Sequence, residues 1–208
     1  MLEPAVLGRP AFGNTGANMA VLILGLAVFL GVHSISIVSP GLRNRALARL
    51  GEGAWKGLYG LISLIGFVLI VYGFGLARRA PIVLYAPPHW MRHVAFLLML
   101  PVFPLLFAAY LPGRIRTAAK HPMLAAVKFW AFAHLLANGL LADVLLFGGF
   151  LAWAVLDRIS LKRRAPQAQR TAPAGRFNDA IAVVLGLAAY AAFIGWAHVR
   201  LFGVSPLG

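Results

Sequence analysis

The 208-residue sequence contains no cysteine and only five acidic residues, and these two absences narrow the chemistry of the chain. Without cysteine there is no disulfide, no thiolate metal site and no cysteine nucleophile, so a metal must be held by histidine, methionine or carboxylate. A glycine-rich phosphate loop and a nucleophile elbow with a Ser-His-Asp order are also missing. Hydrolase and nucleotide-dependent functions therefore have no support.

What the sequence has instead is apolar residues, which make up 61% of the chain, while charged residues make up 12%. This composition excludes an ordinary soluble domain and indicates a multi-pass membrane protein. The net charge of +14 does not indicate a nucleic-acid partner, because the basic residues fall in short blocks between apolar runs. Basic blocks between apolar runs are typical of the loops of membrane proteins, where positive charge determines which side of the membrane each loop faces.

Apolar runs of about 20 residues, long enough to cross a hydrocarbon core of ~30 Å, recur along the chain, so we expect an all-α polytopic membrane helix bundle of about six transmembrane helices. Residues 1–18 are Gly/Pro-rich and are expected to form a disordered extension, with residues 19–208 as a single transmembrane domain. Met19 is an alternative to Met1 as the start. The expected spans are residues 19–38, 57–77, 93–111, two hairpin arms within 122–157, and 179–198.

Two spans carry further signals for helix packing. In the second, small residues recur every third position and predict a smooth strip that another helix approaches closely. In the third, Pro101 and Pro104 predict a kink, because each proline removes a helical hydrogen bond. The small residues of the strip are Gly57, Gly60, Ser63 and Gly66.

The basic residues orient the protein. Six spans place the loops 41–56, 112–121 and 157–178 on one side of the membrane, and these loops hold 13 of the 19 Lys and Arg residues. We therefore expect an inner-membrane protein with these three loops in the cytoplasm and both ends outside.

The stretch 120–158 departs most from an ordinary membrane anchor. It holds two apolar runs around a turn signal at residues 137–139, so we expect a helical hairpin. The alternative, one long helix with a re-entrant piece, would invert the last span. Lys128, His134 and Asp143 lie in these runs, where a charged residue costs about 2.5–3.5 kcal/mol, so they are the first candidates for chemistry.

His33 and His134 are the two imidazoles placed well inside apolar runs. Each alone is typical of a structural histidine bonded to a backbone carbonyl, but a pair of them is what a haem held by two axial histidines requires. Trp130 and Asn138 share the helix face of His134, so Trp130 could cover a ring and Asn138 could bond a polar edge. We predict haem b with His33 and His134 as axial ligands.

His121 competes as a ligand because the depths of the first two histidines differ. At 1.5 Å per residue, His33 lies about 21 Å and His134 about 7 Å below the outer ends of their helices. His121 lies nearer the depth of His33, although a histidine just before Pro122 is equally typical of a helix start. Lys128 shares the face of His121 and would meet an anionic group such as a propionate or a lipid phosphate.

The remaining ionisable residues are expected to play local roles. His89, His93 and His198 are interfacial, and Asp157 with Arg158 forms a charge pair at the inner surface. Asp143 caps the second hairpin arm, and Asp179 lies in the first turn of the last span, where a carboxylate suits the helix dipole.

From Met19 onward the chain resembles the NnrU family of bacterial membrane proteins. The resemblance rests on residues 31–34 (GVHS), Tyr59 with Ser63, His121-Pro122, and residues 130–139 (WAFAHLLANG) with 150–153 (FLAW). The family is associated with denitrification, near nitrite and nitric oxide reductase functions. The resemblance thus implies a membrane protein of nitrogen-oxide metabolism.

The family is in turn similar to the plant zeta-carotene isomerase, a haem b membrane enzyme that isomerises a cis double bond in a polyene. This similarity implies His33 and His134 as haem ligands and a lipid-soluble substrate. The plant enzyme has a cysteine near its second histidine where this chain has Ala131, so a ligand exchange through that cysteine has no counterpart. His121-Pro122 is also loosely similar to isoprenylcysteine-type membrane methyltransferases, which use S-adenosylmethionine.

Several functions stay open at this point. Nitrite or nitric oxide reduction and polyene isomerisation are enzymatic. An assembly or haem-handling factor for the denitrification reductases would not be an enzyme, and a methyltransferase would use no haem. The sequence does not determine the substrate or the oligomeric state.

Overall fold

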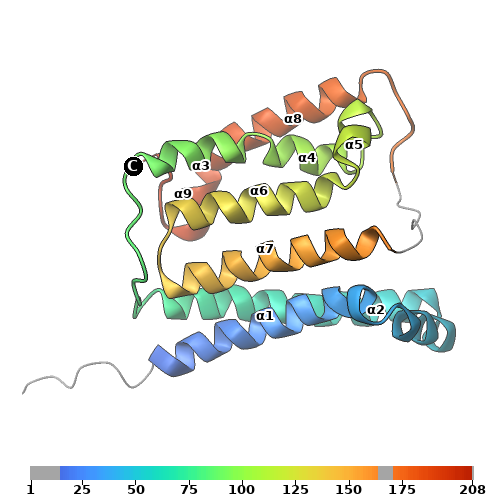
Figure 1. The fold of residues 1–208 in the computed structure, drawn as a ribbon, viewed down its shortest axis with the longest axis horizontal. Coiled ribbons are helices and arrows are strands. Elements are labelled where there is room, and N and C mark those ends of the chain that lie inside the picture. Colours follow the sequence, from blue (N-terminus) through green and yellow to red (C-terminus); the bar gives the residue numbers. More distant parts are fainter. Residues whose placement is uncertain (1–14, 164–170, 208) are drawn as a thin grey trace, which may run out of the picture. The chain divides into compact units, whose positions relative to one another are not determined.

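The computed structural model describes residues 15–163 and 171–207 (Figure 1). The chain divides into two compact units: Met1–Leu84 with Leu140–Leu146, and Tyr85–Gly139 with Phe147–Gly208. Among the described residues, five helical stretches are long and apolar enough to cross a membrane, and a sixth apolar helix is shorter. The predicted all-α polytopic class is confirmed. Residues 1–14 of the predicted extension lie outside the described residues, and the single transmembrane domain stays a prediction.

In the first unit, α1 (Thr15–Val38) and α2 (Pro40–Ala77) are separated by one residue, Ser39. The Ser39 hydroxyl caps α2 by accepting a hydrogen bond from the Leu42 N–H at 3.3 Å, and Pro40 is the first residue of that helix. Ser39 and Pro40 therefore mark both the end of α1 and the start of α2. Residues 41–56, predicted as a loop between two spans, are helical within α2 except at Gly51, whose conformation is non-helical.

Glycines bring α1 and α2 into close backbone contact. A Cβ added to Gly25 would lie 2.6 Å from the nitrogen of Ile70, and one added to Gly66 would lie 2.7 Å from the nitrogen of Phe29. Gly73 meets α1 in the same way. The predicted strip is therefore right only in part: Gly66 belongs to the contact, whereas a Cβ on Gly57 or Gly60 would meet nothing within 4 Å.

The second unit has a kinked helix at its centre. Residues Leu100 and Pro101 separate α3 (Met91–Met99) from α4 (Val102–Ala108), as the prolines predicted. Figure 1 shows these helices between α6 (Pro122–Ala137) and α8 (Asn178–Ala192), and α4 packs against both. A Cβ on Gly186 of α8 would lie 2.4 Å from the Pro104 nitrogen, so the glycine permits this approach. The helix α8 continues into η2 (Phe193–Ala197) and α9 (His198–Phe202).

The predicted hairpin is present as α6 and α7 (Leu141–Leu161), joined by residues 138–140. The unit boundary falls inside α7, so the first residues of α7 belong to the first unit and the rest to the second. Gly139 is required by space: a Cβ there would lie 1.8 Å from the Tyr85 carbonyl oxygen. The Asp143 carboxylate accepts a hydrogen bond from the Leu140 N–H at 3.1 Å, which confirms its capping role.

Asn178 and Asp179, at the start of α8, form hydrogen bonds with the backbone around the start of α5. Asp179 accepts hydrogen bonds from the backbone N–H groups of Arg114 (2.8 Å) and Ile115 (3.0 Å) and thereby caps the short helix α5 (Arg114–Ala119). The Asn178 amide donates to the carbonyls of Pro112 (2.8 Å) and Pro173 (3.0 Å). The carboxylate of Asp179 thus stabilises a second helix in addition to its place in the first turn of α8.

Candidate functional site

His134 lies in the last turn of α6 and is held by two kinds of contact. Its Nδ1 donates a hydrogen bond to the Trp130 carbonyl at 2.8 Å, one helical turn earlier. Its imidazole stacks on Phe147 of α7, with ring centroids 4.5 Å apart and an interplanar angle of 27°. The side chain is therefore fixed from its own helix and from the facing one.

Trp130, His134, Phe147 and Phe150 together form an aromatic cluster of α6 and α7. The Trp130 ring lies 5.5 Å from the His134 ring and meets Phe147 and Phe150 edge-on at 5.1 Å and 5.5 Å. These are favourable edge-to-face distances for aromatic rings. That Trp130 covers a cofactor ring stays a prediction, and Phe147 and Phe150 were not predicted as site residues.

Asn138 lies at the C-terminus of α6. Its amide donates to the His134 backbone carbonyl at 2.9 Å and so caps the helix. Its bond to a polar edge of a cofactor stays a prediction. The Tyr85 hydroxyl adds further bonds to the carbonyls of Leu135 and Asn138. The end of the helix that carries His134 is therefore well fixed.

His33 lies in α1 of the first unit in a comparable setting. Its Nδ1 donates to the Phe29 carbonyl at 2.7 Å, and its ring stacks on Phe29 at 4.2 Å. Tyr59 of α2 lies 5.2 Å away, and Trp55 lies 6.3 Å from Tyr59. Since His33 and His134 belong to different units, their pairing on one iron stays a prediction.

The two histidines share a local pattern: an aromatic residue four positions earlier supplies both a carbonyl and a ring. A carbonyl oxygen only accepts, so Nδ1 carries the proton in each ring and Nε2 is the nitrogen with a lone pair in the neutral imidazole. The hydrogen bond of a structural histidine is thus present in both cases. The same bond orients a histidine that ligates a metal through Nε2.

His121 is the N-cap residue of α6 and is half-buried. Burial is the main cause that lowers its pKa below the ordinary value, followed by the positive charge of Arg158 in α7. Asp157 acts in the opposite direction and raises the pKa. His121 is therefore neutral at pH 7, the form in which a histidine binds a metal.

Lys128, between His121 and His134 along α6, is half-buried. Within residues 15–163 and 171–207 it has no hydrogen bond or ion pair. A lysine in this position can extend its stem along apolar surface and place its ammonium group beside an anion.

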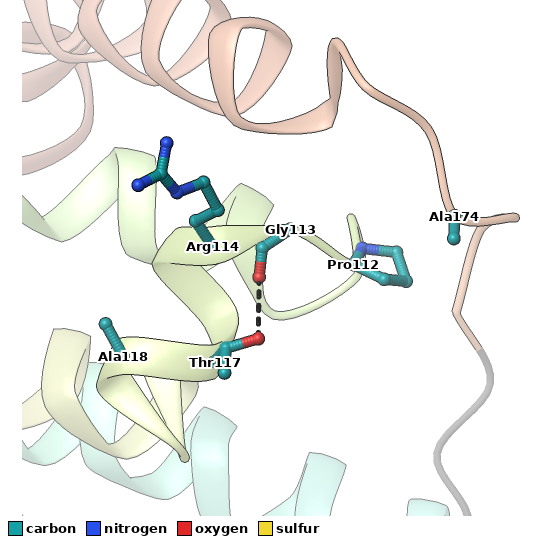
Figure 2. Close-up of a pocket in the computed structure, with 6 residues that line it drawn as sticks. All are labelled: Pro112, Gly113, Arg114, Thr117, Ala118 and Ala174. Atoms are coloured by element: carbon teal, nitrogen blue, oxygen red, sulfur yellow. Dashed lines mark hydrogen bonds between the residues drawn. The ribbon is translucent and has the colours of Figure 1, made fainter.

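Two cavities of the second unit are lined by residues other than His134. One of about 660 Å³ is lined by Arg114, Thr117 and the neighbouring loop, and Figure 2 shows the Thr117 hydroxyl donating to the Gly113 carbonyl (3.0 Å). The other, of about 200 Å³, is lined by His89, Arg92, two prolines and Ala137. Neither cavity was predicted from the sequence.

His89, His93 and His198 are the histidines predicted to lie at the membrane interface. His89 and His93 are four residues apart at the start of α3, a spacing that sequence reasoning overlooked. No group of three or more His, Asp or Glu side chains that could hold a metal ion occurs in the part of the chain that the structure describes. His198 donates from Nδ1 to the Val204 carbonyl at 2.7 Å near the end of the last span.

Comparison with protein families gives one match, which covers residues 21–206: the family described as NnrU protein. Comparison with curated proteins gives no match, and neither does comparison with solved structures. The family match includes both His33 and the aromatic cluster.

Proposed function

The chain belongs to the NnrU family, and from this premise we propose that it binds haem b in the bacterial inner membrane, with His134 as one axial ligand. The observation that carries the proposal is the hydrogen bond from His134 Nδ1 to the Trp130 carbonyl, which leaves Nε2 as the ligating nitrogen. The apolar and aromatic surroundings of this imidazole suit a porphyrin. The basic loops face the cytoplasm in this proposal.

The roles of His33 and His121 differ in this proposal. His121 and His134 are on the same helix, and their separation of about 20 Å at 1.5 Å per residue greatly exceeds the span of two metal–nitrogen bonds of about 2 Å. These two cannot ligate one iron. His33 is therefore the histidine proposed for the second axial position, and His121 is a ligand only in place of His134.

Other residues of the second unit support the ligand. Phe147 and Trp130 restrict rotation of the His134 ring, and Asn138 fixes the helix end. Lys128 offers its ammonium group to a carboxylate such as a propionate. A haem iron with an exchangeable axial position binds small ligands such as nitric oxide, and one with two fixed imidazoles transfers electrons.

The proposed biological role is handling of nitrogen oxides, which follows the family association with denitrification, or isomerisation of a lipid-soluble polyene, which follows the similarity to the plant zeta-carotene isomerase. A non-enzymatic assembly or haem-handling factor for denitrification reductases is the second candidate. The same side-chain pattern supports it, because reversible capture of haem needs the ligands and no substrate cleft.

Optical spectra of the purified full chain test the proposal. We expect a Soret band in the wild type that His134→Ala and His33→Ala abolish or shift and that His121→Ala leaves unchanged. His198→Ala is the matched control, because its Nδ1 also bonds a backbone carbonyl. A wild-type sample reconstituted with haem that shows no Soret band, or a band insensitive to His134→Ala, would overturn the proposal.

Addition of CO or nitric oxide to the reduced protein separates the roles. A spectral shift indicates a displaceable ligand and favours nitrogen-oxide or isomerase chemistry. An unchanged bis-imidazole spectrum favours haem handling or electron transfer. Binding of S-adenosylmethionine by a protein without a Soret band would indicate a methyltransferase.

A further inference from the structure

α2 is longer than a membrane crossing requires, and residues 40–50 at its start are in excess. As one straight helix its 38 residues would extend about 57 Å at 1.5 Å per residue, roughly twice the hydrocarbon thickness of ~30 Å. Residues 57–77 alone suffice to cross.

The register of α1 against α2 gives the membrane depth at which residues 40–56 begin and end. The close contacts pair Leu22 with Gly73, Gly25 with Ile70, and Phe29 with Gly66, so each step along α1 matches an equal step back along α2. Extending this register to the end of α1 brings Val38 to the depth of Gly57, where the two helices are no longer in contact. Since only Ser39 separates Val38 from α2, residues 40–56 begin and end at the same depth, at the border of the membrane.

Gly51 turns the chain within this segment. It has a φ of 78° and a ψ of 164°, a non-helical conformation that glycine adopts without the strain of a Cβ. Residues 40–50 are thus a separate helix, and residues 52–56 connect it back to the span. Because this short return bridges little depth, the helix of residues 40–50 must run at a low angle to the membrane surface.

The two faces of this helix differ in character. Leu42 and Leu50 lie two turns apart on one face, and each is 49% exposed within the unit. Asn44 and Ala48, displaced by two positions, lie on the opposite face and are exposed as well. The segment carries three basic residues and no acidic one: Arg43, Arg45 and Arg49.

We propose that residues 40–50 form an interfacial amphipathic helix whose leucines enter the acyl boundary and whose arginines bind the phosphates of anionic phospholipids. Exposed leucines beside unopposed arginines match a lipid surface, which offers apolar chains below a layer of negative charge. Arg45 and Arg49 have no hydrogen bond or ion pair among the described residues, so their charge is available to phosphate. Further along, Glu52 pairs with Lys56, so the uncompensated charge is concentrated before Gly51.

Spin labels can test this arrangement directly, because the chain contains no cysteine that would compete for the label. The full chain is reconstituted in vesicles of phosphatidylcholine with phosphatidylglycerol as four single variants: Leu42→Cys, Leu50→Cys, Asn44→Cys and Ala48→Cys. Labels at 42 and 50 are expected to collide with oxygen, which dissolves in the bilayer. Labels at 44 and 48 are expected to collide with a water-soluble nickel chelate. Equal access of nickel to all four positions would overturn the proposal.

The lipid preference is tested in the same vesicles. Pure phosphatidylcholine, or Arg45→Gln with Arg49→Gln, should weaken membrane association of the segment by roughly fivefold for each charge that no longer meets a phosphate. Arg45→Lys with Arg49→Lys is the matched control and should retain most of the contrast between the two faces. If the two faces differ in oxygen and nickel access to the same extent in both lipids and in all variants, the phosphate contact is refuted.

Discussion

Trp130 and His134 are joined twice: the backbone carbonyl of Trp130 accepts the Nδ1–H at 2.8 Å, and its indole ring lies 5.5 Å from the imidazole. A substitution at position 130 removes the ring but keeps the carbonyl. The orientation of the histidine and the packing around it can therefore be changed independently.

Trp130→Ala should lower the free energy of unfolding by up to about 3 kcal/mol, because the ring fills the contact with Phe147 and Phe150. Trp130→Phe should lose less than about 1.5 kcal/mol, since an aromatic ring remains. Thermal unfolding in detergent measures both. Equal losses for the two variants would show that the edge-to-face contacts do not stabilise the hairpin.

Gly73→Ala should disrupt the pair of α1 and α2, because the new Cβ would lie 2.4 Å from the Leu22 backbone nitrogen. The expected cost is about 1–3 kcal/mol. Gly60→Ala is the control on the same helix, where a Cβ meets nothing within 4 Å, and it should be neutral or stabilising by up to about 1 kcal/mol. A comparable effect of both changes on thermal unfolding would contradict the observed register.

Asp179→Ala should release the N-terminus of α5, because the carboxylate accepts the N–H groups of Arg114 and Ile115. Loss of such a cap costs about 0.5–2 kcal/mol. Hydrogen exchange at these two amides should accelerate, while Asp179→Asn should retain part of the protection. Glu52→Gln, at an exposed ion pair, is the control and should leave α5 unchanged.

His121 should make the protein less stable in acid. Its pKa is lowered in the folded state, chiefly by burial and then by Arg158, so the unfolded chain takes up a proton first as the pH falls through its ordinary value of 6.5. Stability is full above that value and decreases below it, down to the folded pKa. His121→Gln should reduce the difference in Tm between about pH 8 and about pH 5.5. An unchanged difference would show that His121 titrates alike in both states.

The sequence predicted which residues of α6 belong to the candidate site, but not the contacts that they make with α7. Sequence position placed His134, Trp130 and Asn138 on one face, because helical periodicity relates residues four apart without reference to other elements. The stacking of Phe147 on His134 required the hairpin to close, so it was not predictable from either arm alone. Asn138 is the C-cap residue of α6, and its side-chain amide and its backbone N–H both donate to the His134 carbonyl at 2.9 Å.

The sequence by itself determined the membrane class, the positions of the spans, the kink at Pro101 and the turn of the hairpin, since each depends on local composition and on backbone chemistry. The tertiary structure decided which glycines meet α1 and that Asp179 caps a helix some 65 positions earlier in the chain. These features depend on which distant backbone groups come within a few ångströms of each other. No property of a single segment specifies that proximity, because it arises only when helices far apart in the chain pack together.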